Sequence, residues 1–168
     1  MRLRLTKAVA AVAVAANLSS GAAAADCLSR AELDAHKIRH LQTQLMVGAL
    51  RCRGANDLGQ RDNYNRFINR HHFDLEAGRD RLTDYFKRTH GGAYQAAMDR
   101  HVTALANRIS RQSQNMVGYC EQIAALGDVL TASRAADLVE AIEIAPIQPD
   151  VPAGACHLTA EGTTKPAR

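Results

Sequence analysis

Four cysteines are the residues of this chain whose type and spacing most directly suggest covalent chemistry. They stand at positions Cys27, Cys52, Cys120 and Cys156. No two of them are spaced C-x-x-C, which argues against a thioredoxin-like redox site or a zinc knuckle, and the missing C-x-x-C-H pattern excludes covalent c-type haem. An even number of cysteines is typical of disulfides in an exported chain. A reactive thiolate at Cys52, between Arg51 and Arg53, is the alternative.

Histidines are the second group that could do chemistry, and two of the seven are spaced for a metal. His36 and His40 are four residues apart, which places both rings on one face of a helix. That face lies largely opposite the apolar stripe of the same segment, and Lys37 and Arg39 would repel a cation. We therefore predict that both rings are exposed to solvent.

His71 occupies a core position of the next apolar pattern, and we interpret it as a buried neutral imidazole that is hydrogen-bonded across the fold. The alternative is a ligand-binding site at His71 and His101 that Tyr64 and Tyr85 would line. However, the positions of the two histidines along their helices would place them well apart. The chain has no G-x-G-x-x-G, Walker or G-x-S-x-G pattern, so we predict no catalytic residue, no cofactor and no bound metal.

Helices must position these residues, because apolar residues recur along the chain at spacings of three and four. The first helix is predicted over residues 29–52, since Ser29 and Glu32 form a capping box at its start. A second helix is predicted over residues 64–89. It ends before a pair of glycines, which stop helices readily.

The second half of the chain continues this pattern as far as a proline-containing tail. A third helix is predicted over residues 98–130, with Gly118 and Gly127 as the positions where it can kink or end, and a short fourth helix over residues 133–145. Three prolines then forbid a helix, so residues 146–168 are predicted to be an extended, loosely held tail. Because no strand pattern competes, the sequence predicts an all-α, up-down-up helical bundle.

The lengths of these predicted helices indicate which cysteines can form disulfides with each other. A helix rises by about 1.5 Å per residue, so Cys27 and Cys52 lie roughly 40 Å apart at opposite ends of the first helix. The third helix returns Cys120 to the end that carries Cys52, and the tail can bring Cys156 to Cys27. We therefore predict the pairs Cys52–Cys120 and Cys27–Cys156, with the tail pinned by Cys156.

The first 25 residues have the pattern of a secretory signal peptide. Three basic residues precede a short apolar run, and an Ala-x-Ala site ends at Ala25. Without these three basic residues, 18 remain against 17 acidic ones, a net charge of +1. We therefore expect a periplasmic or secreted protein with one bundle domain over residues 26–145. It should have no transmembrane segment after cleavage and no nucleic-acid partner.

Three stretches of the chain resemble a family of small exported bacterial proteins of uncharacterised function. They are LQTQLMVGALRC, YNRFINR and GYCEQIAAL. In similar chains a cysteine follows L-M-V-x-A-L, a Y-N-x-F block comes next, and an aromatic–cysteine pair lies downstream. The resemblance spans residues 27–130, but the family supplies no known activity and so assigns no catalytic residue. Gly48 stands where the family has alanine, which would weaken the first helix by up to about 1 kcal/mol.

Two functions remain open on the sequence alone. The first is a non-enzymatic exported helical protein that binds another protein or a component of the cell envelope. The second is a helical bundle that binds a metal or a small ligand through core histidines. The export pattern, the even number of cysteines and the missing catalytic patterns favour the first.

Overall fold

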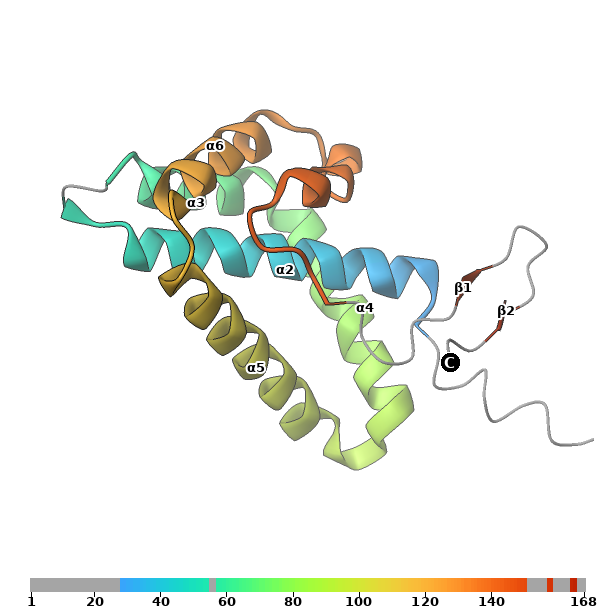
Figure 1. The fold of residues 1–168 in the computed structure, drawn as a ribbon. Coiled ribbons are helices and arrows are strands. Elements are labelled where there is room, and N and C mark those ends of the chain that lie inside the picture. Colours follow the sequence, from blue (N-terminus) through green and yellow to red (C-terminus); the bar gives the residue numbers. More distant parts are fainter. Residues whose placement is uncertain (1–27, 55–56, 151–156, 159–163, 166–168) are drawn as a thin grey trace, which may run out of the picture.

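A computed structural model describes residues 28–54, 57–150, 157–158 and 164–165 (Figure 1). The fold is all-α, as the sequence predicted. Its α-helices are α2 (Arg30–Arg51), α3 (Gln60–Arg70), α4 (His72–His90), α5 (Tyr94–Gln114) and α6 (Tyr119–Ala132). Short 3-10 helices are η2 (Gly91–Ala93), η3 (Ala135–Asp137) and η4 (Glu140–Ile144). The predicted signal peptide and the predicted Cys27–Cys156 pair lie outside the described residues.

Helix α2 forms the centre of the bundle and packs against each of the other four α-helices. In Figure 1, α3 and α6 lie on one side of α2, and the α4–α5 hairpin extends from the other side. The capping box predicted at Ser29 is confirmed, because Ser29 and Glu32 exchange hydrogen bonds at the start of α2. Two short antiparallel strands, β1 (His157–Leu158) and β2 (Thr164–Lys165), pair outside the bundle.

Two predicted long helices are each divided into two in the structure. The second divides at His71, where φ is −106° and ψ is 22°, into α3 and α4. The third divides after Gln114, and α6 begins behind Gly118, whose φ of 69° is left-handed. Each break lets the two halves pack against different helices. Helices α3 and α6 pack against each other, and so do α4 and α5. The predicted fourth helix is instead the pair of 3-10 segments η3 and η4, a geometry that suits short connections.

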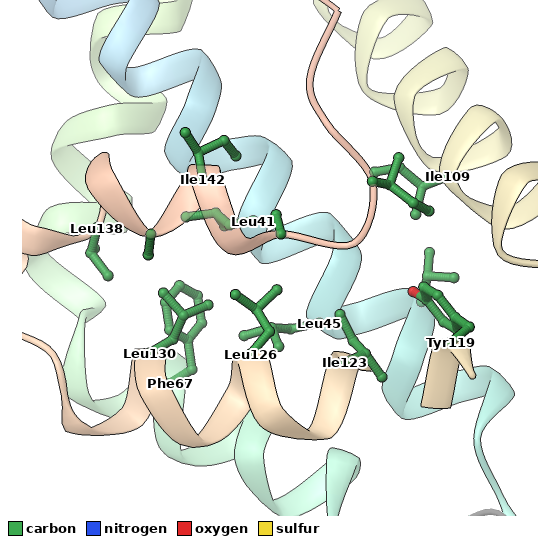
Figure 2. Close-up of a cluster of buried hydrophobic side chains, with 14 of the residues drawn as sticks. Leu41, Leu45, Phe67, Ile109, Tyr119, Ile123, Leu126, Leu130, Leu138 and Ile142 are labelled. Atoms are coloured by element: carbon green, nitrogen blue, oxygen red, sulfur yellow. The ribbon is translucent and has the colours of Figure 1, made fainter. Parts of the chain in front are cut away.

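The apolar core lies between α2, α3, α5, α6 and η4. Figure 2 shows side chains of α6 pointing toward α2 and η4, with Phe67 of α3 beside them. Ten side chains labelled in that view are buried: Leu41, Leu45, Phe67, Ile109, Tyr119, Ile123, Leu126, Leu130, Leu138 and Ile142. The helical stripes that the sequence indicated therefore meet in one core.

The predicted disulfide between Cys52 and Cys120 is confirmed. The two Cα atoms are 5.7 Å apart and the sulfurs are bonded at 2.05 Å. The bond joins the end of α2 to the start of α6, so Cys52 is a structural crosslink and the reactive-thiolate alternative is wrong. In the part of the chain that the structure describes, no helix is both long enough and apolar enough to cross a membrane.

Gly48 lies at a close approach of α2 to Ile123 of α6. A Cβ atom placed on Gly48 would lie 2.8 Å from Cγ1 of Ile123, a fully buried and β-branched side chain that cannot move aside. The steric cost therefore exceeds the gain in helix propensity that alanine would bring. The expectation that Gly48 makes the chain less stable than alanine would at this position is wrong for this chain.

The Gly48→Ala variant is therefore expected to lower the free energy of unfolding by about 1–3 kcal/mol, as overpacking of a core does. Gly78→Ala is the matched control. A Cβ atom on Gly78, inside α4, would lie an ordinary 3.9 Å from Ala35, so this change should stabilise the protein by up to about 1 kcal/mol. Urea unfolding measures both changes. A Gly48→Ala variant as stable as the wild type would contradict the close approach of the two helices.

Candidate functional site

Two histidines of α2 that were predicted to face solvent are buried. His36 is 4 % exposed and His40 is 0 % exposed. The prediction failed because α2 is covered on more than its apolar side. Helix α5 packs against α2, and the residues that follow η4 cross it (Figure 1).

We call residues 145–150 the strap, because this segment without regular secondary structure lies across α2. Its central residue, Ile147, is buried. The Gln44 side-chain amide donates a hydrogen bond to the Ile147 carbonyl oxygen and accepts one from the Ile147 N–H at 3.2 Å. His40 Nε2–H donates to the same carbonyl oxygen at 2.7 Å. The start of the predicted tail is therefore packed on the bundle, and the prediction that it is loosely held is wrong for these residues.

The strap ends in an ion pair with α5. Arg108 Nη1 lies 2.7 Å from Oδ2 of Asp150, whose side chain is 75 % exposed. The pair thus holds the outer end of the strap at the surface, whereas His40 and Gln44 hold its middle in the interior. Residues from α2 and α5 together form the surface on which the strap lies.

A third histidine joins the buried pair from α5. The His101 ring lies 5.0 Å from the His36 ring and 5.4 Å from the Phe86 ring, measured between centroids. Burial, together with the charges of His101 and His40, lowers the pKa of His36 to about 4. Burial also lowers the pKa values of His40 and His101. All three rings are therefore neutral at pH 7.

Each ring of this cluster keeps one buried nitrogen that has no hydrogen-bond partner among the described residues. These atoms are His36 Nε2, His40 Nδ1 and His101 Nε2. Within residues 28–54 and 57–150, however, no three His, Cys, Asp or Glu side chains are arranged so that they could hold a metal ion. The cluster is a group of three neutral bases, and the Asp150 carboxylate of the strap is the charge that favours protonation of His40.

His71 is buried, as the sequence predicted, and is hydrogen-bonded across the fold. Its Nε2–H donates to the Leu130 carbonyl oxygen at 2.9 Å, and its Nδ1 lies 3.7 Å from Oδ2 of Asp74. The ring also packs against Phe67. Both ring nitrogens therefore face oxygen atoms of this chain, so neither points into a space where a ligand could bind.

The other residues of the alternative ligand site lie in different places. His101 lines a cavity of about 10 Å³ between α2, α4 and α5, which has room for one water molecule at most. Tyr85 packs beside Phe86 and under the Arg88 guanidinium on α4. Tyr64 lies in a groove beside the disulfide. The structure therefore does not gather these four residues into one site.

The groove at Tyr64 is a larger candidate for binding than the cavity at His101. We call it the disulfide-end groove, and its volume is about 590 Å³, within the usual range for ligand sites. Its lining residues come from the end of α2, the following loop and the start of α3: Met46, Ala49, Leu50, Cys52, Arg53, Asp57, Arg61, Tyr64 and Asn65.

Apolar and cationic groups are exposed side by side at this groove. Leu50 is 58 % exposed, and Leu58, next to a lining residue in sequence, is 52 % exposed. The guanidinium groups of Arg53 and Arg61 form no ion pair or hydrogen bond with the described residues. Asp57 is the acidic lining residue, and its carboxylate accepts a hydrogen bond from the Gly59 N–H at 3.0 Å. The groove thus offers an apolar surface and two available positive charges.

One signal in the sequence could have revealed the buried side of α2. The eleven residues 40–50 contain no Asp, Glu, Lys or Arg, although a helix with one solvent-exposed face normally carries charges there. An uncharged run of three turns indicates a helix that is covered all round. His40 and Gln44 lie within this run, and His36 lies one turn before His40.

Comparison of the chain with protein-family models, curated proteins and solved structures finds no match.

Proposed function

We propose that the chain is a non-enzymatic exported binding module, and that the disulfide-end groove binds a segment of a partner protein. The segment would carry an apolar side chain next to carboxylates. The observation that carries this proposal is the exposed Leu50 beside the guanidinium groups of Arg53 and Arg61, which have no ion pair or hydrogen bond with the described residues. Exposed leucine is costly in water unless another surface covers it, and arginine binds carboxylates through two parallel hydrogen bonds.

The disulfide supports this proposal because it fixes one wall of the groove. Cys52 lines the groove and is bonded to Cys120 of α6, so the end of α2 cannot fray away from the loop that follows. A wall that is held in place before binding loses less conformational entropy when the partner arrives. Rigid positioning of Leu50 and Arg53 is what a recognition site requires.

Export is supported by the same bond. Disulfides persist in oxidising compartments such as the periplasm and are rare in the cytosol. The N-terminal pattern of residues 1–25 indicates the route, and we propose that the protein acts in the periplasm or outside the cell. Intact mass measurement of protein recovered from the periplasm is expected to give a chain that begins at Asp26 and carries an intact Cys52–Cys120 bond.

Site-specific photo-crosslinking in living cells tests the groove. A photoreactive phenylalanine analogue placed at Leu50 is expected to give a discrete crosslinked product with a partner protein. Charge reversal in the Arg53→Glu/Arg61→Glu variant should reduce that product at least about tenfold, because each lost charge-assisted contact is worth at least 1.4 kcal/mol. The measurement is the yield of crosslinked product, normalised to the amount of folded protein.

Matched controls separate recognition at the groove from unspecific contact. The same analogue at Phe73, which is 82 % exposed on α4, should give no such product. Arg81→Glu/Arg100→Glu makes the same charge change on the exposed α4–α5 hairpin and should leave the yield from Leu50 unchanged. The proposal fails if Leu50 gives no product, or if Phe73 gives the same product.

A further inference from the structure

We propose that the strap is a latch that stays closed while His36, His40 and His101 are neutral, and that acidification opens it. The latch consists of the strap (residues 145–150), the α2 side chains that hold it and the histidine cluster of α2 and α5. This inference is independent of the disulfide-end groove, which lies at the other end of α2 from His36.

The closed latch depends on a small number of polar contacts and on two strap residues, Ala145 and Ile147, that are buried in the apolar core. Ile147 is held through its backbone by Gln44 and His40, and Asp150 is held by Arg108. The strap has no helix or sheet hydrogen bonds of its own. Segments with few backbone hydrogen bonds and an exposed end open at a lower free-energy cost than the helices of the core.

Protonation would place new N–H groups where the described residues offer no acceptor. The bare nitrogens of His36, His40 and His101 are the atoms that take up a proton, and all three are buried without a partner among the described residues. A buried N–H without an acceptor loses its hydrogen bond to water and gains nothing in return. The lowered pKa values of these rings agree with that cost.

The positive charges that face the cluster oppose protonation: Arg108 of α5 acts on all three rings, and Arg39 of α2, beside Arg79 of α4, acts on His101. The Asp150 carboxylate and backbone hydrogen bonds to the strap favour protonation of His40 and His36, but burial outweighs them. Asp150 already pairs with Arg108, and the α2 carboxylates of Asp34 and Glu32 pair with Arg30 and Arg88. Protonating both His36 and His101 would therefore set two cations about 5.0 Å apart, between centroids, with no carboxylate of the described residues paired to either ring.

Lifting the strap relieves the burial of the protonated rings with the smallest structural change. The other elements around the cluster are helices that the core holds along their length, whereas the strap contributes only Ala145 and Ile147 to the core and its Asp150 already lies at the surface. Water that enters as the strap leaves can solvate His40 and His36 and accept their new protons. The bundle itself, with its disulfide, can remain folded while the strap is open.

Hydrogen exchange of the Ile147 amide, measured by NMR on the full mature chain, tests the latch. This amide donates to Gln44 only when the strap is closed. Relative to intrinsic rates at each pH, its exchange is expected to rise at least about tenfold between pH 7.0 and pH 4.5, while α6 amides such as Leu126 stay protected. Loss of protection in α6 at the same pH would mean global unfolding and would overturn the proposal.

Variants assign the effect to the histidines. In His36→Gln/His101→Gln, which keeps polar side chains but removes two titrating groups, Ile147 exchange at pH 4.5 should stay within about twofold of its value at pH 7.0. The exposed His72→Gln variant should behave as the wild type. If the double variant opens as the wild type does, the proposal is wrong. If it fails to fold, the imidazole signals of the wild type decide: protonation of His36 while Ile147 stays protected would overturn the latch.

Discussion

Replacing Cys52 and Cys120 together by serine is expected to lower the free energy of unfolding by about 4 kcal/mol. The two residues are 68 positions apart in sequence, and a crosslink of that length removes a large loop-closure entropy from the unfolded chain. The bond also joins α2 to α6, two helices whose facing side chains form much of the core. Its loss therefore affects the element around which the other helices pack.

Urea and thermal unfolding of the wild type and of Cys52→Ser/Cys120→Ser measure this effect. A loss of this size corresponds to a fall of roughly 10–20 °C in Tm for a chain of this length. Wild-type protein under a strong reductant should approach the stability of the double variant, because the same crosslink is opened. Equal stability of the oxidised wild type and the variant, within about 1 kcal/mol, would show that the unfolded chain gains no freedom from the change.

The features that could be predicted from the sequence are those set by neighbouring residues or by helix geometry. The capping box at Ser29 needs only two side chains three residues apart, and it is present. The Cys52–Cys120 bond follows from the rise per residue of a helix and the order of the turns. The burial of His71 follows from its place in the apolar pattern.

The breaks within the second and third predicted helices could not be found in the same way. The apolar spacing runs through His71 without interruption, because α3 and α4 both bury the same stripe against α2. Tertiary packing decides where a helix bends toward a different neighbouring helix. The apolar pattern along one segment carries no information about that packing. Gly118 did mark the second break, since a left-handed φ is easiest for glycine.

The histidine cluster and the ion pair of Glu32 with Arg88 were missed for a related reason. Glu32 and Arg88 are 56 residues apart and meet at 2.6 Å only because α4 packs beside the start of α2. Hydrogen bonds from Arg88 and Ser29 lower the Glu32 pKa, although burial alone would raise it. His36 was placed in solvent because amphipathic reasoning assigns one buried face to a helix, whereas α2 is enclosed by its neighbours.

The stability of the wild type is expected to fall steeply as the pH is lowered from about 6.5 toward 4. The pKa of His36 is lowered from 6.5 to about 4 in the folded chain, first of all by burial. Between these two values the unfolded chain binds more protons than the folded chain, so unfolding is favoured as the pH falls. A shift of this size is worth about 3 kcal/mol from His36. That contribution is fully present above pH 6.5 and is lost toward pH 4.

Urea unfolding at a series of pH values between 7.0 and 4.0 measures this dependence. His40 and His101, whose pKa values burial also lowers, act in the same direction, so His36→Gln should reduce the slope without abolishing it. His72→Gln, in which an exposed histidine of α4 is replaced, should keep the wild-type slope. A His36→Gln variant whose stability depends on pH as strongly as the wild type would show that His36 is not the group responsible.

Opening of the strap would change the shape of this curve but not its direction. Once the strap has lifted, the folded chain takes up protons at His36 almost as readily as the unfolded chain does, so the stability stops falling. A plateau that begins at the pH where the Ile147 amide becomes exposed would place the acid response in the strap. A continuous fall in stability to pH 4, with the Ile147 amide still protected from exchange, would mean that protonation destabilises the whole fold and does not open the strap.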